Sequence, residues 1–321
     1  MRIGKITETI LNRSVIKNIR YRSGELLQGP SPGRDCGRIA IKKEREMVFS
    51  ANPVTGPTDL LGRLAFFRMA NDIVCSGARP SGMLITLLLP EASGEKELKT
   101  IMGQLGTLAE KYEVDIIGGH TEVCREVSAP LLSITGMGYP EQGVAVEKGS
   151  AKPGMDIVMT KWAGAAGAAR MVREKRTELC TRFREDFLEQ AENYLETISC
   201  MPEAAIAWET GAAALHNASA DGVFGALWEL GQALGMGLEV DLKKIPIRQE
   251  SVEICEFFDV NPYLIPAEGV LLVVTKDGGQ LARRYEKAGI SAAVIGHMMD
   301  NNDKVITNGD ERRFLVPPGN Q

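Results

Sequence analysis

Apolar residues recur at intervals of three to four residues along two stretches in the first half of the chain. The first stretch runs from Leu60 to Ile73, and the second covers residues 95–112. This spacing predicts two amphipathic helices. Gly77 offers a stop for the first helix, and Pro80 prevents its continuation. Uninterrupted apolar runs predict strands at residues 83–89, 115–117 and 131–138.

Two shorter strands are expected before the first helix, at residues 38–41 and 47–51. The segment 52–57, which contains Pro53 and Gly56, has the composition of a turn. Strands that alternate with helices in this way predict an α/β domain, to which we assign residues 1–150.

The second half also mixes strands and helices, after a Gly- and Pro-containing connection at residues 149–154. We assign residues 151–321 to a second domain. The charged stretch 173–197 is expected to be helical and largely exposed. The other expected helices cover residues 164–172, 202–215, 223–234, 251–258 and 279–288. The expected strands cover residues 156–160, 238–241, 270–275, 292–295 and 304–307.

Composition narrows the range of partners and compartments. The chain has 321 residues and a formal net charge of -5, and it lacks a dense basic cluster, so nucleic acid is not an expected ligand. The longest apolar run, residues 83–89, is too short to span a bilayer, and we expect no membrane segment and no signal peptide. Six cysteines without a Cys-x-x-Cys pair indicate reduced thiols in a cytoplasmic protein.

Asn71 and Asp72 place two polar side chains on the otherwise apolar first helix. A carboxylate in an apolar environment needs hydrogen bonds, a cation or a metal, because leaving it bare and buried costs several kcal/mol. The alternative is that Asp72 lies on the solvent side of the helix. The helical pattern alone leaves both interpretations open.

Three small, polar segments are candidates for ligand binding: residues 29–37, 118–123 and 216–222. Their glycines permit a close approach of the backbone to a phosphate. The chain has neither a P-loop nor a dinucleotide-binding Gly-x-Gly-x-x-Gly sequence, so a phosphate site would be of another kind. His120 and Glu122 are expected on opposite sides if their segment is a strand, and close together if it is a turn. A structural role for His120 is an alternative.

Acidic residues in these segments have the oxygen chemistry that Mg²⁺ requires. Mg²⁺ usually binds through one or two carboxylates together with substrate phosphates, and Asp35, Asp72 and Glu122 are the candidates. His216 and His297 stand too far from other ligand-type residues to predict a zinc site.

A series of short segments, in a fixed order along the chain, resembles one enzyme family. They are Gly33-Arg34-Asp35-Cys36, Asn52-Pro53-Val54-Thr55, Ala70-Asn71-Asp72, Gly77-Ala78-Arg79-Pro80, Gly118-Gly119-His120-Thr121-Glu122-Val123, Lys152-Pro153-Gly154, residues 216–222, Ile245-Pro246 and Ala267-Glu268-Gly269. Over almost its whole length the chain resembles the family of aminoimidazole ribonucleotide (AIR) synthetase. That family includes selenophosphate synthetase, thiamine-monophosphate kinase and the hydrogenase-maturation protein HypE, and the resemblance is greatest to the HypE-like branch.

The resemblance implies a two-domain PurM-like fold, with an N-terminal α/β domain that dimerises through its sheet and a C-terminal α+β domain. It implies ATP bound in a cleft between the domains, Mg²⁺ held by acidic residues, and phosphorylation of an amide or related oxygen. Asp35, Asp72 and Glu122 are then the expected metal residues. His120 and Glu268 are the expected catalytic residues. The expected nucleotide-binding residues are Gly33, Arg34, Asn71, Gly118, Gly119, Thr121, Asp221 and Gly222.

The chain also departs from the family pattern. Relatives commonly have Asp where this chain has Asn52, and Asp and Glu where it has Asn217 and Ala220. An Asp-to-Asn change keeps the shape of the side chain and removes the charge that would hold Mg²⁺. Asp221 offers a carboxylate one residue away.

HypE ends in a cysteine that carries its substrate group, whereas the last cysteine of this chain is Cys255 and the chain ends at Gln321. We therefore do not expect HypE's reaction on this chain's own tail. Two hypotheses follow. The first is an ATP- and Mg²⁺-dependent enzyme, a homodimer, that activates a small-molecule or protein-borne substrate with an amide or acid group. The second is a non-catalytic nucleotide-binding or assembly protein with a degenerate metal site.

Overall fold

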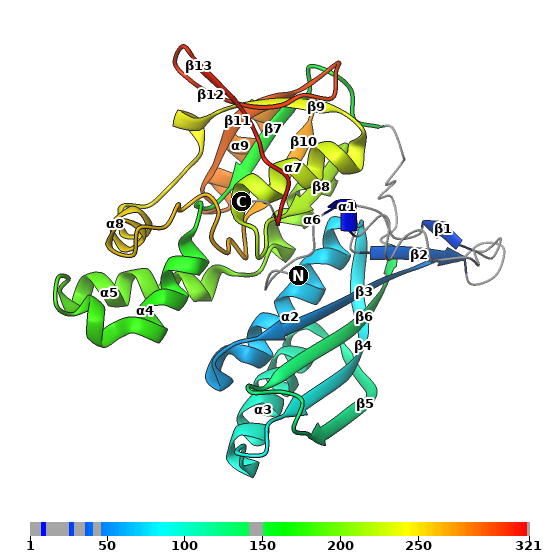
Figure 1. Cartoon of the computed structure of the whole chain (residues 1–321). Helices are drawn as coiled ribbons and strands as arrows, with labels where there is room; N and C mark the ends of the chain where they lie inside the picture. The colour runs from blue at the N-terminus through cyan, green and yellow to red at the C-terminus, as the bar shows by residue number, and fades with distance from the viewer. Residues whose placement is uncertain (1–7, 11–25, 29–35, 41–45, 141–149, 320–321) are drawn as a thin grey trace. The chain divides into compact units, whose positions relative to one another are not determined.

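The computed structural model describes residues 8–10, 26–28, 36–40, 46–140 and 150–319. These residues belong to two compact units, each with its own β-sheet (Figure 1). The N-terminal unit contains the described residues 26–28, 36–40 and 46–140, and the C-terminal unit contains residues 8–10 and 150–319. Within the described residues, no helix combines the length and the apolar character needed to cross a membrane.

The N-terminal unit is a six-stranded sheet with two helices on one face (Figure 1). The helices are α2 (Thr58–Cys75) and α3 (Glu95–Tyr112). The strand order is β1-β2-β3-β6-β4-β5, in which β4 is parallel to β5 and antiparallel to β6. The strands are β1 (Leu26–Gln28), β2 (Cys36–Ala40), β3 (Glu46–Thr55), β4 (Ala78–Leu89), β5 (Asp115–Val123) and β6 (Leu131–Pro140).

The two faces of this sheet differ in burial. Along β4, Met83, Ile85 and Leu87 lie beneath the helices and are buried. Leu84 points to the opposite face and is 40% exposed, as the two-residue period of a strand requires. Tyr139 of β6 lies on the same outer face and is 52% exposed. The helix-covered face is therefore the core of the unit, and its other face is open.

The expected turn at residues 52–57 is largely strand. β3 continues to Thr55 and includes Pro53. Proline cannot donate a hydrogen bond to a neighbouring strand, so it is confined to edges and bulges of a sheet. Pro53 fits this rule because the pairing of β2 with β3 ends at Ser50, which leaves the following residues of β3 paired with β6 alone.

The C-terminal unit is a seven-stranded sheet with the order β13-β12-β9-β11-β7-β10-β8. Its strands are β7 (Asp156–Thr160), β8 (Ala214–Asn217), β9 (Gly237–Asp241), β10 (Leu271–Thr275), β11 (Ala292–Met299), β12 (Lys304–Asn308) and β13 (Glu311–Phe314). Its helices are α1 (Glu8–Ile10), α4 (Ala165–Leu179), α5 (Glu185–Glu192), α6 (Met201–Glu209), α7 (Gly222–Leu234), α8 (Gln249–Phe257) and α9 (Gly278–Lys287), with 3-10 helices η3 (Asn193–Thr197) and η4 (Leu242–Lys244).

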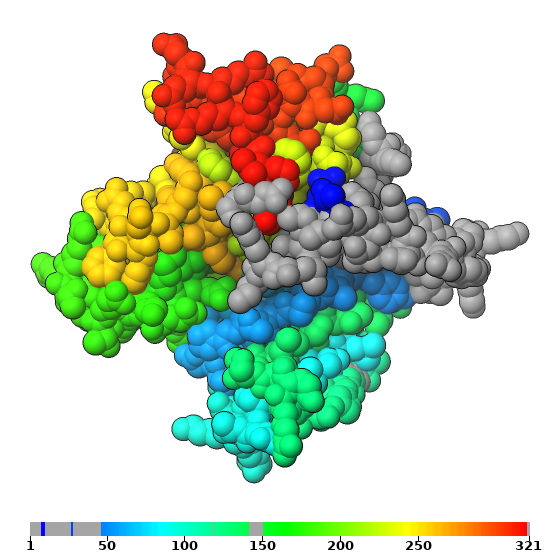
Figure 2. All heavy atoms as spheres, viewed as in Figure 1, coloured from blue at the N-terminus to red at the C-terminus, as the bar shows by residue number. Residues whose placement is uncertain are grey.

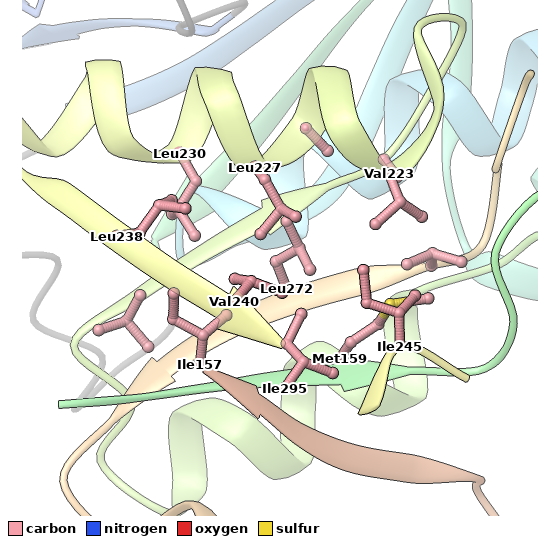
Figure 3. Packing of buried hydrophobic residues seen from close by; sticks show 14 of the residues in the cluster. Ile157, Met159, Val223, Leu227, Leu230, Leu238, Val240, Ile245, Leu272 and Ile295 are labelled. Carbon is pink, nitrogen blue, oxygen red and sulfur yellow. The ribbon is translucent and has the colours of Figure 1, made fainter. Parts of the chain in front are cut away.

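Helices cover both faces of this sheet. α7 packs Val223, Leu227 and Leu230 against one face, as Figure 3 shows. α6 and α9 contact the sheet as well, and every residue of β10 is buried. Alternate residues of a strand point to opposite faces, so a fully buried strand must be covered on both. The mixed sheet with helices on its two faces agrees with the expected α+β class.

One expectation in this unit is wrong in its bounds, and another is confirmed with added detail. The helix expected over residues 202–215 ends at Glu209, because Gly211 adopts a left-handed conformation (φ 78°) and the chain then enters β8. The stretch 173–197 is mostly helical and largely exposed, as expected. It divides into the end of α4, α5 and η3, and it buries Leu188 and Tyr194. In Figure 2 the green surface of α4 and α5 adjoins the gold surface of α8.

Candidate functional site

Asp72 of α2 is buried, with 8% exposure, and is hydrogen-bonded to two residues of β3. Its Oδ2 accepts from Ser50 Oγ at 2.7 Å and from Asn52 Nδ2 at 2.5 Å. Asn52 Nδ2 also donates to Ser50 Oγ at 2.7 Å. The solvent-side alternative for Asp72 is therefore wrong. Two segments separated in the sequence meet at one buried carboxylate, and the neighbouring Asn71 is 2% exposed.

The chemistry of this cluster suits a hard cation. Asp72, Asn52 and Ser50 carry carboxylate, amide and hydroxyl oxygens, which are typical ligands of Mg²⁺. Asp72 Oδ2 and Ser50 Oγ already take part in the hydrogen bonds described above. Among the described residues, no group of three or more His, Cys, Asp or Glu side chains comes together as a metal site. A Mg²⁺ ion at this cluster would therefore depend on phosphates and water for most of its ligands.

His120 and Glu122 lie together on β5, with His120 Nε2 and Glu122 Oε2 at 3.1 Å. The expectation that a strand would separate them is wrong, because residues two apart in a strand share a face. Both side chains are more than half exposed, so their interaction adds little to stability. They pair with Thr86 and Leu88 of β4, which face away from α2 and α3. The structure thus places Glu122 on the opposite face of the sheet from Asp72.

The Gly118-Gly119 pair has a structural explanation. The pairing of β4 with β5 shifts register between Met83 and Leu84, just before Gly118 and Gly119 take their partners. Gly119 has φ 149°, and a Cβ atom there would overlap the carbonyl oxygen of Ile85. A glycine is required for this close approach of two backbones. Thr121, on the same strand, is exposed.

In the C-terminal unit, the predicted polar turn after β8 meets the Ala267-Glu268-Gly269 segment. Ala218 N–H donates to Val270 O at 2.9 Å, and Ala267 N–H donates to Ser219 O at 3.0 Å. Glu268 is 6% exposed, and its Oε1 lies 3.9 Å from Arg170 Nη1 on α4. A buried carboxylate therefore lies near a guanidinium, on a segment whose backbone is hydrogen-bonded to this turn.

Gly222 begins α7 and is packed against the loop at residues 261–266. It has φ 67°, and a Cβ atom there would overlap the carbonyl oxygen of Tyr263. The same carbonyl oxygen accepts a hydrogen bond from Phe224 N–H at 3.1 Å. Gly222 thus has a packing requirement of its own, whether or not it contacts a nucleotide. Asp221 occupies the N-cap position of α7 without making a side-chain capping bond.

The same loop covers the start of α4. Pro266 O accepts from Gly167 N–H at 2.8 Å, and a Cβ atom on Gly164 would overlap Pro262 O. The first turns of α4 and α7 are both glycine-rich, and backbone N–H groups in each of them donate to carbonyl oxygens of this loop. Those N–H groups are therefore not available to a ligand.

The predicted residues Gly33, Arg34 and Asp35 lie outside the described residues.

Sequence reasoning did not single out Lys161, which directly follows β7. It has φ 58°, a left-handed conformation that costs a residue with a side chain roughly 1–2 kcal/mol. Its Nζ lies 2.6 Å from Glu203 Oε1 and donates to Ser199 O at 2.5 Å and to Gly269 O at 3.0 Å. The sequence feature that could have identified Lys161 is its position at the end of an apolar strand, because a charged group in an apolar environment needs a partner.

Comparison with known proteins links both units to one family. The family model for the AIR synthase related protein, N-terminal domain, matches residues 33–139, and the model for the C-terminal domain of the same family matches residues 152–308.

Individual relatives are more distant. A protein of Methanocaldococcus jannaschii, provisionally named as a hydrogenase expression/formation protein, is 25% identical over 98% of this chain and 93% of its own length. Carbamoyl dehydratase HypE of Cupriavidus necator is 23% identical over 84% of this chain and 78% of its own length. A crystal structure of the hydrogenase maturation protein HypE in complex with ATP has a TM-score of 0.68 and 18% identity, and the match covers 98% of this chain and 95% of that one. At this identity the structural likeness establishes the fold.

Proposed function

The chain belongs to the AIR synthase-related family, and from this membership we propose that it is an ATP- and Mg²⁺-dependent enzyme that activates an amide- or acid-bearing substrate. The reaction class is that of a synthetase, ligase or dehydratase. The observation that carries the proposal is the buried cluster of Ser50, Asn52 and Asp72, in which two family-like segments converge on one carboxylate. The substrate is small or is carried by a protein.

The names of the relatives favour an amide as the activated group, since one of them is a carbamoyl dehydratase. In the proposed step the amide oxygen of the substrate attacks the γ-phosphorus of ATP. An oxygen–phosphorus bond forms, the bond from the γ-phosphorus to the bridging oxygen breaks, and ADP leaves. Catalysis of such a transfer depends mainly on positioning and on neutralising the phosphate charge.

Bound Mg²⁺ would supply charge neutralisation on the phosphates. We assign its protein ligand to Asp72, with Asn52 and Ser50 beside it, and we retain Asp35, which lies outside the described residues, as a second candidate. Glu122 lies on the opposite face of the same sheet, so it is a candidate only for a separate ion. Candidate nucleotide contacts are Gly33, Arg34, Asn71, Gly118, Gly119, Thr121, Asp221 and Gly222. His120 and Glu268 are the candidates for proton handling or substrate orientation.

A thermal-shift titration with ATP, in the presence and absence of Mg²⁺, tests the proposal. At about a hundred times its dissociation constant a ligand adds roughly 2.7 kcal/mol to the folded state and raises Tm by a few degrees. The shift should require Mg²⁺ and should disappear in Asp72→Asn. Asp59→Asn, an exposed change in the first turn of the same helix, is the matched control and should keep the shift. An undiminished shift in Asp72→Asn would show that the metal is held elsewhere.

The alternative function is a nucleotide-binding or assembly protein that does not turn over. It is favoured by Asn52, whose amide contacts the carboxylate of Asp72 where a second carboxylate is expected in relatives. Asn52→Asp and Asn217→Asp distinguish the two functions. Mg²⁺-dependent ATP hydrolysis that appears only in these variants would identify a decayed enzyme. Hydrolysis by the unaltered protein would eliminate this alternative.

The proposal also includes a cytoplasmic homodimer formed through the sheet of the N-terminal unit. The exposed apolar side chains of Leu84 and Tyr139 on the open face of that sheet support this arrangement.

A further inference from the structure

Lys161 uses its ammonium group to connect three segments of the C-terminal unit. Its Nζ contacts Glu203 Oε1 of α6, the carbonyl oxygen of Ser199 before α6, and the carbonyl oxygen of Gly269. An ammonium group has three hydrogen-bond donors, so these contacts use all of them. The side chains of Lys161 and Glu203 are 13% and 3% exposed, and the connection is therefore largely shielded from water.

The segment that receives one of these bonds is the turn that carries Glu268. Gly269 has φ 93°, and a Cβ atom there would overlap the carbonyl oxygen of Thr197, so the turn rests directly on backbone. On the N-terminal side of Glu268, Ala267 N–H is bonded to Ser219 O. On its C-terminal side, the Lys161 ammonium holds the carbonyl of Gly269. The backbone is thereby held one residue before Glu268 and one residue after it.

The ion pair is poorly arranged as a simple stabilising contact. Glu203 Oε2 is buried and accepts no hydrogen bond from any residue that the structure describes. Such an unsatisfied oxygen is unfavourable, and buried ion pairs often stabilise a fold less than apolar side chains of similar size would. Lys161 also holds a left-handed backbone conformation that disfavours residues other than glycine. These features are consistent with selection for something other than stability.

We propose that Lys161 is a positioning residue, which orients Glu268 by holding the carbonyl group of Gly269. The inference rests on the proposed function, in which Glu268 serves the ATP-dependent reaction. The competing explanation is that the ion pair only attaches α6 to the end of β7.

The test uses the full chain and removes both charges together. Lys161→Met alone would leave the Glu203 carboxylate buried without its cation, which strongly destabilises a fold, so the main variant is Lys161→Met/Glu203→Leu. Glu203→Gln is the first control, because it keeps the bond from Lys161 to Gly269. Tyr194→Phe is the second control. It removes a buried hydrogen bond to Glu250 in the same unit and leaves the turn untouched.

Two measurements decide between the explanations. Amide hydrogen exchange, which needs no ligand, should accelerate on the order of tenfold at residues 268–271 in the double variant and in neither control. The kcat for MgATP hydrolysis should fall on the order of 10- to 100-fold with little change in KM. In a Glu268→Gln background the same double change should cause almost no further loss, since Lys161 acts through Glu268.

Unchanged exchange in the turn, or an equal fold-loss of kcat with and without Glu268, would overturn the positioning role. Absence of ATP hydrolysis in the unaltered protein is a different outcome. It would refute the proposed function, and with it the catalytic role of the turn that carries Glu268. The hydrogen-exchange comparison would still show whether Lys161 holds that turn.

Discussion

Tyr194 of η3 is a buried residue whose ionisation is opposed by its surroundings. Its hydroxyl group donates to Glu250 Oε2 at 3.1 Å. Burial, together with the negative charge and hydrogen bond of Glu250, raises the pKa of Tyr194 to about 12. Burial alone raises the pKa of the Cys255 thiol to about 12 as well. Both groups are therefore held in their neutral forms in the folded protein.

This arrangement predicts a loss of stability at alkaline pH. The folded-state pKa of Tyr194 lies above its ordinary value of 10.0, so its contribution is complete below pH 10.0 and is lost as the pH rises toward about 12. Cys255 acts with the same sign from its ordinary value of 9.0. Tm should fall across this range, and the fall should be shallower in Tyr194→Phe when both proteins are measured by calorimetry. Identical slopes would mean that Tyr194 ionises equally easily in the folded and unfolded states.

At the scale of elements, the loop at residues 261–266 determines how two helices of the C-terminal unit begin. Tyr263 stacks on Phe224 with ring centroids 4.9 Å apart, and its carbonyl group lies against Gly222. The loop thus holds the first turn of α7 by an aromatic contact and by a backbone hydrogen bond.

α7 supplies its own matched test of this packing. Gly222 and Gly235 lie at opposite ends of the helix and have nearly equal φ values of 67° and 66°, but a Cβ atom on Gly235 would meet nothing within 4 Å. Gly235→Ala should cost only the left-handed strain, about 1–2 kcal/mol. Gly222→Ala should cost about 1–3 kcal/mol more, because the loop must also move. Urea unfolding measures both, and equal losses would show that the loop adapts freely.

The sequence predicts local elements well where their periodic pattern is strong. The expected helix at residues 95–112 and strand at residues 156–160 have the bounds of α3 and β7. The predictions are wrong where a Pro or Gly is taken as the end of an element although the strands around it continue. Pro53, which lies within β3, is an example. β13 was not expected, because its Glu-Arg-Arg-Phe sequence is an exposed edge strand without an apolar run.

The candidate site was harder to predict, because its contacts are made between distant segments. The meeting of Asn52 with Asp72 depends on the packing of α2 against β3, which no local period encodes. It was anticipated only through the family resemblance. The role of Lys161 requires knowing that Ser199, Glu203 and Gly269 surround the end of β7.

At the scale of the whole molecule, the open face of the N-terminal sheet predicts self-association. Leu84→Arg should place a charge in the proposed dimer interface and convert the protein to a monomer in analytical ultracentrifugation. Val260→Arg, at a 38% exposed position in the C-terminal unit, is the control and should not change the sedimentation coefficient. A Leu84→Arg protein that sediments as the unaltered protein does would exclude this face as the interface.

The strand order of the C-terminal unit also affects how the protein is made. β7 is the first strand of its sheet to leave the ribosome, yet it lies between β10 and β11, which are synthesised much later. Until those strands appear, the apolar residues Ile157, Val158 and Met159 have no neighbouring strand to pair with. Contacts between segments that are far apart in the sequence form slowly, and apolar side chains stay exposed to solvent until they form. The C-terminal sheet therefore closes near the end of translation, and the apolar side chains of β7 lack their strand neighbours until then.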